Sequence, residues 1–271
     1  MAVFKVAAMT GGVILLGIAG TYAVKNWLLS LFNQKHITSP QTGTFGEDFQ
    51  LHFLDTTDDE NDLYWEFKLK FLEEVKAGIH DSKRDSSSLS NEFSTPNIEN
   101  IEALKKICAA AYNKKTKDIH VSGGVTADDA DKLNKSKYEE NVWMFCSMDK
   151  IMPVTLGVSP SERDKSYEKY EINSNPSPKK ENTKRSSLVS SIWVNASFWK
   201  RQTKAFFSWD ISLLETNSAL KELRQTNDKS KRTWKELARV CESQYKSENN
   251  EETTDEVVFK VCSLRGKTIQ T

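Results

Sequence analysis

An uncharged stretch of nineteen residues near the amino terminus, Val6 to Val24, constrains this chain more than any other feature. At about 1.5 Å of rise per residue, a helix of that length reaches roughly 28 Å, close to the ~30 Å hydrocarbon core of a bilayer. A lone segment in lipid must satisfy its own backbone hydrogen bonds, which leaves a helix as the only stable state. We therefore expect residues 1–35 to form a single transmembrane anchor with an interfacial extension, in contact with membrane lipid through residues 6–24.

A cleaved signal peptide is the alternative interpretation of this segment, because Thr21-Tyr22-Ala23 loosely resembles a small-residue cleavage site. The length of the apolar run, which resumes after Lys25 at Trp27, favours an uncleaved anchor. Few charges set its orientation, with Lys5 before the span and Lys25 after it. We prefer the orientation in which the soluble part is extracellular.

The charge balance argues against nucleic acid as a partner. Lysine and arginine together number 38, the same as aspartate and glutamate, so the formal net charge is zero. A chain without net charge has no overall field that would attract a polyanion or steer an acidic substrate.

The chain after the anchor contains an internal repeat, built from three short blocks that occur twice in the same order. The clearest match between the two copies is a Leu-x3-Cys-x3-Tyr pattern, and a pair formed by an aromatic residue and Trp precedes this pattern in both. The matching segments are Tyr64-Trp65 and Phe198-Trp199, Leu104 to Tyr112 and Leu237 to Tyr245, and Glu140 to Ser147 and Glu256 to Ser263. We infer a duplicated unit.

Apolar residues recur at helical spacing in both copies, and no alternating run predicts a strand. The expected fold class is mainly α, a transmembrane helix followed by two related small helical units joined by disordered linkers. Helices are expected at 62–77, after a Thr95-Pro96 cap, through Tyr138 to Cys146, at 187–209, and in three shorter segments up to Cys262.

Polar composition sets the expected domain boundaries, because segments rich in Ser, Asn, Lys and Asp bury too little apolar surface to fold. The expected divisions are the anchor at 1–35, a flexible linker at 36–60, helical unit 1 at 61–150, a disordered linker at 151–186, helical unit 2 at 187–264 and a tail at 265–271.

Four cysteines, two in each copy, are the most suggestive set of side chains. If the soluble part is exported, Cys108 with Cys146 and Cys241 with Cys262 can each form a disulfide that joins two helices. The alternative is that each is a small apolar residue on a buried helix face. Both interpretations make these residues structural.

Other site chemistry finds no support in the sequence. The histidines at 36, 52, 80 and 120 are scattered and there is no Cys-x2-Cys pair, so no metal site is expected. No nucleophile elbow, P-loop, zinc-protease or dinucleotide motif occurs. We therefore expect no catalytic residue and no cofactor-binding residue, and we expect that the protein is not an enzyme. Trp65 and Trp199 are expected in the core. The Asn195-Ala196-Ser197 sequon falls in an expected helix.

The combination resembles a family of uncharacterised paralogous membrane-anchored proteins of haemotropic mycoplasmas. The features that carry the resemblance are the Val6 to Val24 anchor, Tyr64-Trp65, the Leu104 to Tyr112 helix and Phe145 to Ser147, then the second copy. The resemblance implies membrane association and surface exposure, with no established activity. The two-copy body departs from the single unit expected in that family.

These observations favour a single-pass protein for surface display, or for interaction with a host or envelope partner. A membrane-tethered enzyme with dispersed active-site residues is one alternative, and converging titratable groups in a cleft would indicate it. A scaffold that faces the cytosol, with all four cysteines as free thiols, is the other.

Overall fold

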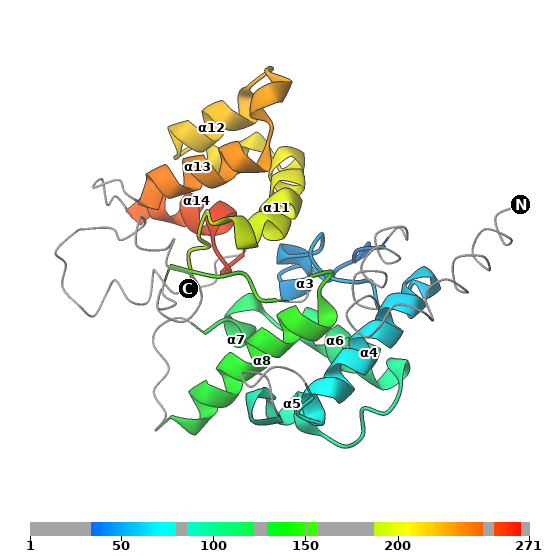
Figure 1. The fold of residues 1–271 in the computed structure, drawn as a ribbon. Coiled ribbons are helices and arrows are strands. Elements are labelled where there is room, and N and C mark those ends of the chain that lie inside the picture. Colours follow the sequence, from blue (N-terminus) through cyan, green and yellow to red (C-terminus); the bar gives the residue numbers. More distant parts are fainter. Residues whose placement is uncertain are drawn as a thin grey trace, which may run out of the picture.

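The computed structural model describes residues 34–79, 86–121, 129–149, 151–156, 187–245 and 252–266. The expected transmembrane segment at 6–24 lies outside this part of the chain. Among the residues that the structure describes, no helix is both long and apolar enough to cross a membrane. The described chain is mainly helical, as expected, and its extended segments form only isolated β-bridges (Figure 1).

Two halves follow one another along the chain, and Figure 1 shows the first below the second. We call residues 34–149 the first half and residues 151–266 the second half. The helices of the first half are α3 (Phe45–Asp48), α4 (Asp62–Lys76), α5 (Asn91–Ser94), α6 (Ile101–Tyr112), α7 (Thr116–Ile119) and α8 (Ala130–Cys146). Those of the second half are α11 (Ala196–Ser208), α12 (Ser218–Gln225), α13 (Trp234–Tyr245) and α14 (Glu252–Cys262), with short 3-10 turns at Trp193–Asn195, Ile211–Leu214 and Lys229–Lys231.

Helices α4 and α6 follow from their sequences. Helix α4 covers nearly all of the expected 62–77 and buries a stripe that includes Trp65 and Leu72. The expected cap at Thr95-Pro96 is wrong, because α6 begins at Ile101, where the Asn100 side chain accepts a hydrogen bond from the Ala103 N–H. An asparagine at this position satisfies an N–H group that the first helical turn leaves free.

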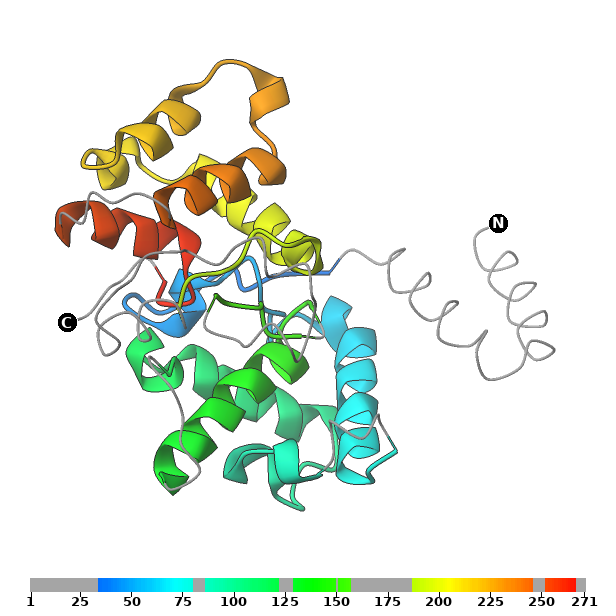
Figure 2. The same ribbon diagram turned by 60° about the vertical axis from the view of Figure 1, so that its left-hand side comes forward.

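The expectation of a flexible linker at 36–60 is also wrong. This segment forms α3 and places Phe45, Phe49 and Phe53 in the core, each no more than 1 % exposed. Three phenylalanines spaced four apart supply the apolar surface that the polar composition of the segment conceals. In Figure 2 the segment around α3 lies between the helices of the two halves, so it belongs to the folded body.

The single helix expected at 187–209 is divided in the structure. Residues 187–190 are extended, and α11 begins only at Ala196. The Asn195 side chain causes the division, because its amide donates to the carbonyl oxygens of Val154 and Ser190, at 2.8 and 2.9 Å. These bonds hold the extended segment against the start of α11. Residues 151–156, expected as linker, and Arg265 and Gly266, expected as tail, likewise belong to the body.

One set of hydrogen bonds occurs in both halves. In each, an asparagine before the long helix bonds an extended segment, the tryptophan that follows donates to a carbonyl of that segment, and a tyrosine hydroxyl reaches two further carbonyls. The first-half members are Asn61, Trp65 and Tyr112, and their counterparts are Asn195, Trp199 and Tyr245. The matching blocks of sequence therefore perform matching structural tasks.

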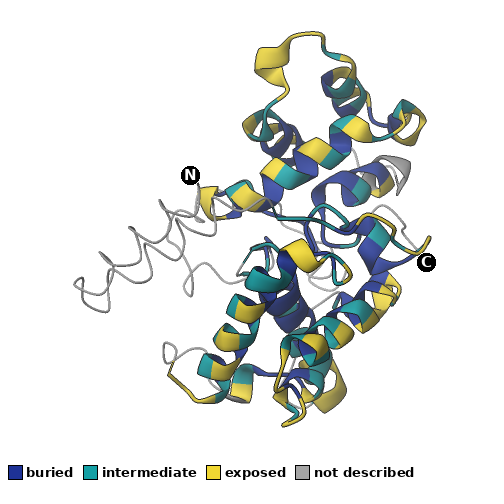
Figure 3. Cartoon of the chain, turned by 90° about the vertical axis from the view of Figure 1, so that its right-hand side faces the viewer, coloured by how far each residue is buried: buried dark blue, intermediate teal, exposed yellow. Residues whose placement is uncertain are grey.

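The two halves pack directly on each other, with buried residues continuing from one to the other (Figure 3). Aromatic rings cross the boundary, where Phe198 of α11 lies 4.9 Å from His52 and 6.3 Å from Trp143 between ring centroids. Residue 266 also reaches the first half, since its Cα faces the Asp48 carboxylate of α3. The described parts of the two halves thus form one packed body and are not two separate units joined by a linker.

Candidate functional site

The four cysteines are paired as Cys108 with Cys146 and Cys241 with Cys262. The first disulfide joins α6 to α8 and the second joins α13 to α14, with Cα atoms 5.5 and 5.8 Å apart. All four side chains are fully buried, and none of the described cysteines is free. These sulfurs therefore hold helices together and offer no nucleophile.

The residues that the structure describes contain no cluster of three or more His, Cys, Asp or Glu side chains suited to a metal ion. Of the four histidines, His80 lies outside the described part. His36 is partly exposed at the start of the body, whereas His52 and His120 are buried at the boundary between the halves. The boundary therefore holds two of the three described histidines.

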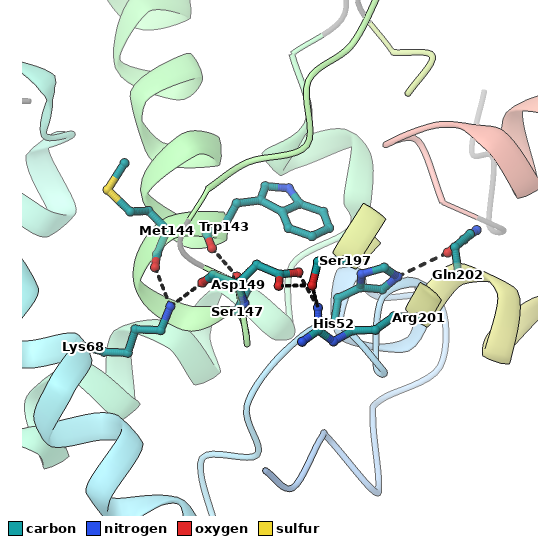
Figure 4. Close-up of polar contacts among 9 residues, drawn as sticks. All are labelled: His52, Lys68, Trp143, Met144, Ser147, Asp149, Ser197, Arg201 and Gln202. Atoms are coloured by element: carbon teal, nitrogen blue, oxygen red, sulfur yellow. Dashed lines mark hydrogen bonds and ion pairs between the residues drawn. The ribbon is translucent and has the colours of Figure 1, made fainter. Parts of the chain in front are cut away.

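His52 is the centre of the first polar group at this boundary, which we call the His52 junction (Figure 4). Its Nε2 lies 3.2 Å from the Gln202 side-chain oxygen, and the Gln202 amide donates to the Val261 carbonyl at 2.7 Å. Because the amide nitrogen of Gln202 is engaged by Val261, its oxygen is the atom that faces the imidazole. His52 therefore carries its proton on Nε2 and bridges the turn that follows α3 in the first half to α11 of the second.

Burial, together with a smaller effect of the nearby Arg201 guanidinium, lowers the pKa of His52 to about 4, against the opposing influence of Asp149. The imidazole is therefore neutral at physiological pH. Its Nδ1 is buried and has no hydrogen-bond partner among the residues that the structure describes. Rings of Phe49, Trp143 and Phe198 surround it, which explains why desolvation dominates.

The second member of the junction is an ion pair between Asp149, just after α8, and Arg201 of α11. Ser197 donates its hydroxyl to Asp149 Oδ1 at 2.6 Å and accepts from Arg201 at 3.0 Å. Burial alone would raise the pKa of Asp149, but the Arg201 charge and the hydrogen bonds hold it below its usual value. Lys68 fixes the same turn, because its ammonium donates to the carbonyls of Met144, at 2.7 Å, and Asp149.

A separate polar group at the boundary joins Ser187, His120 and Glu139. His120 Nε2 lies 2.7 Å from the Ser187 hydroxyl, and His120 Nδ1 lies 2.7 Å from Glu139 Oε1. The other carboxylate oxygen of Glu139 accepts from the Val121 N–H at 2.9 Å. Ser187 belongs to the second half and the other residues to the first, so this group is a further bond between the halves.

Serine, histidine and carboxylate in this order are the parts of an acyl-transfer triad. A serine nucleophile must meet a carbonyl carbon, but Ser187 is 0 % exposed and His120 and Glu139 are 4 % and 3 % exposed. In this conformation the triad is closed to a substrate. What it does is satisfy three polar side chains that the contact between the halves buries.

The sequence indicated none of the residues at the boundary as a site. His52, Asp149 and Arg201 come from segments up to 149 positions apart, and each looks like an ordinary polar residue in its own segment. One feature of the sequence is consistent with the Asp149 site once the structure is known. Ser197 and Arg201 lie four apart on α11, so both can reach one carboxylate from a single helix face.

Searches against protein-family models, curated proteins and solved structures give no match to this chain.

Proposed function

We propose that this chain is a single-pass membrane-anchored binding protein whose body is displayed on the outer side of the membrane. The disulfides Cys108–Cys146 and Cys241–Cys262 carry the proposal. Disulfides form and persist in oxidising compartments and are rare where thiols are kept reduced. Two buried bridges in a body of this size favour export over a scaffold that faces the cytosol.

The binding role is supported by the kind of body that the two halves make. We infer that they arose by duplication, because the same asparagine, tryptophan, tyrosine and disulfide recur at equivalent places. The recurring bonds and the contact between the halves stabilise a rigid support and leave the outer helix faces free to vary. The Ser187 group favours this role over an enzyme, since its three side chains are each no more than 4 % exposed.

A two-part experiment on cells that express the full chain tests the placement of the body. The redox state is measured by alkylation in denaturant before and after reduction, because the four sulfurs are buried and react slowly in the folded protein. We expect no alkylation before reduction and four alkylated cysteines after it.

Sidedness is then measured with Lys117→Cys, an exposed position on α7, and a maleimide that does not cross membranes. Labelling of intact cells is the expected result, with a cytosolic protein of the same cells as the unlabelled control. Four free thiols together with labelling only after lysis would contradict the proposal and favour the cytosol-facing scaffold.

A further inference from the structure

Six cations gather at the end of the second half that lies farthest from the first, where α12 leads into α13 (Figure 1). We call this set the basic tip: Lys221, Arg224, Lys229, Lys231, Arg232 and Lys235. The same interval, residues 221–235, holds only two carboxylates, Glu222 and Asp228. The local excess is four positive charges in a chain whose formal charge is zero.

The equivalent interval of the first half has the opposite charge. The cysteine and tyrosine of α6 and α13 match at an offset of 133, which places residues 221–235 opposite residues 88–102. That stretch contains Glu92, Glu99 and Glu102 and no lysine or arginine. The shared fold therefore does not require cations at this place, and the basic tip is a property of the second half alone.

Backbone carbonyls and an aromatic ring hold two of the cations in place. Arg232 donates from Nε and Nη2 to the Thr226 carbonyl, at 2.9 and 2.7 Å, and Arg224 donates to the Trp209 carbonyl at 3.1 Å. Both guanidinium groups lie over the Phe207 ring, with centroid distances of 5.3 Å for Arg232 and 6.0 Å for Arg224. Backbone and ring contacts fix the position of these charges but do not neutralise them.

The carboxylates near the tip bond mainly to other groups, and only weaker electrostatic interactions join Asp228 to Lys231 and Asp210 to Arg224. Asp228 accepts from the N–H and hydroxyl of Ser230, at 2.9 and 2.6 Å, and these bonds lower its pKa. Glu236 pairs with Arg239, one turn along α13. None of the ion pairs among the residues that the structure describes includes a cation of the basic tip.

We propose that the basic tip binds an acidic polysaccharide, a linear chain that carries sulfate or carboxylate groups. This rests on the proposed function, since an outward-facing body meets such polymers, and it names the partner class. The remaining N–H groups of Arg232 can donate to sulfate or carboxylate oxygens, and the exposed lysines around it add attraction along a chain. Lys229, Lys231, Arg232 and Lys235 are all exposed, so their charged ends are available.

The surroundings of the tip favour a water-soluble polyanion over a bilayer. Between residues 218 and 235 no large hydrophobic side chain is exposed, whereas a membrane-docking surface presents apolar side chains for insertion beside its cations. The two aromatic rings of this region, Phe207 and Trp234, are partly buried and already contact cations of the tip, which disfavours their stacking against the bases of a single-stranded nucleic acid.

The test uses the full-length protein in neutral detergent and a fluorescent heparin oligosaccharide, with binding measured by anisotropy over a range of salt concentrations. The tip variant replaces Lys221, Lys229, Lys231 and Lys235 with glutamine and keeps both arginines. The control variant removes the same four charges at exposed lysines elsewhere: Lys70, Lys106, Lys115 and Lys117. Circular dichroism verifies that both variants remain folded.

We expect the wild-type protein to bind heparin more weakly as salt rises, and neutral dextran not to compete. The tip variant should bind about tenfold more weakly or worse, with a shallower salt dependence, because each exposed charge contributes modestly and is screened. The control variant should stay within about threefold of the wild type.

Three results would overturn the proposal: no heparin binding by the wild type at physiological salt, equal losses in the two variants, or binding to phosphatidylserine vesicles that exceeds binding to heparin. Because the purified protein is used, these outcomes do not depend on sidedness. A body found in the cytosol would contradict the proposed function while the heparin result still reports on the tip.

Discussion

Lowering the pH from 7 to 5 is expected to destabilise the folded protein through His52. Burial lowers the pKa of this imidazole to about 4, against an ordinary value of 6.5. The unfolded state therefore takes up the proton first as the pH falls, so His52 reduces the free energy of unfolding between pH 6.5 and pH 4. The full shift corresponds to about 3 kcal/mol, of which about 2 kcal/mol is lost between pH 7 and pH 5.

The measurement is urea unfolding of the full-length protein in neutral detergent, followed by tryptophan fluorescence at both pH values. His52→Gln is the comparison, because a glutamine amide can still donate to Gln202 but does not titrate in this range. The charged groups that act on His52 are Arg201 and Asp149. The low pKa of Asp149 makes its own contribution fall only below its usual 3.8, outside this window.

We expect the loss of stability from pH 7 to pH 5 to be about 2 kcal/mol greater in the wild type than in His52→Gln. The comparison uses the change in the free energy of unfolding between the two pH values, because the substitution also alters packing and that effect is present at both pH values. Equal losses in the two proteins would refute the assignment of a low pKa to the buried imidazole.

Three further mutational experiments probe the body. A double-mutant cycle with Asp149→Asn and Arg201→Met should give a coupling energy of about 1 to 2 kcal/mol in urea unfolding, and additive effects would show that the pair contributes nothing. Gly266→Ala should lower stability by at least about 1 kcal/mol more than Gly78→Ala. Both glycines have positive φ, at 73° and 64°, but only at residue 266 would a Cβ meet another group, at 2.3 Å; equal thermal shifts would contradict this. Tyr245→Phe should cost about 1 kcal/mol, because its hydroxyl reaches two backbone carbonyls, and an unchanged melting temperature would count against that role.

Local patterns in the sequence were enough to predict the helical fold class and the repeated elements. The buried face of α4 and the Leu-x3-Cys-x3-Tyr pattern of α6 and α13 are periodic over a few turns, so neighbouring residues suffice to identify them. The cysteine pairs could be proposed because each occurs once per copy. Whether they form disulfides depends on distances across two helices, and spacing alone left that open.

Boundaries and contacts between the halves depended on residues far apart in the chain. The segment at 36–60 looked like a linker because Thr, Asp and Gly outnumber its three phenylalanines, and only a partner surface makes those rings a core. Asn195 ends an otherwise helical pattern through bonds to Val154, 41 positions earlier. The His52 junction needs both halves in place, so no single stretch of sequence indicates it.

Two extended segments of the second half, residues 154–156 and 188–190, are joined by backbone hydrogen bonds. The Leu156 N–H donates to the Leu188 carbonyl at 2.9 Å, and the Ser190 N–H to the Val154 carbonyl at 3.0 Å. Residues 154–156 and 188–190 therefore lie side by side in the body. A change in the number of residues between positions 156 and 187 leaves both partners of each of these bonds in the chain, and the entropic cost of joining two chain positions grows only slowly with the number of residues between them. An epitope tag inserted in this interval should therefore leave both bonds in place.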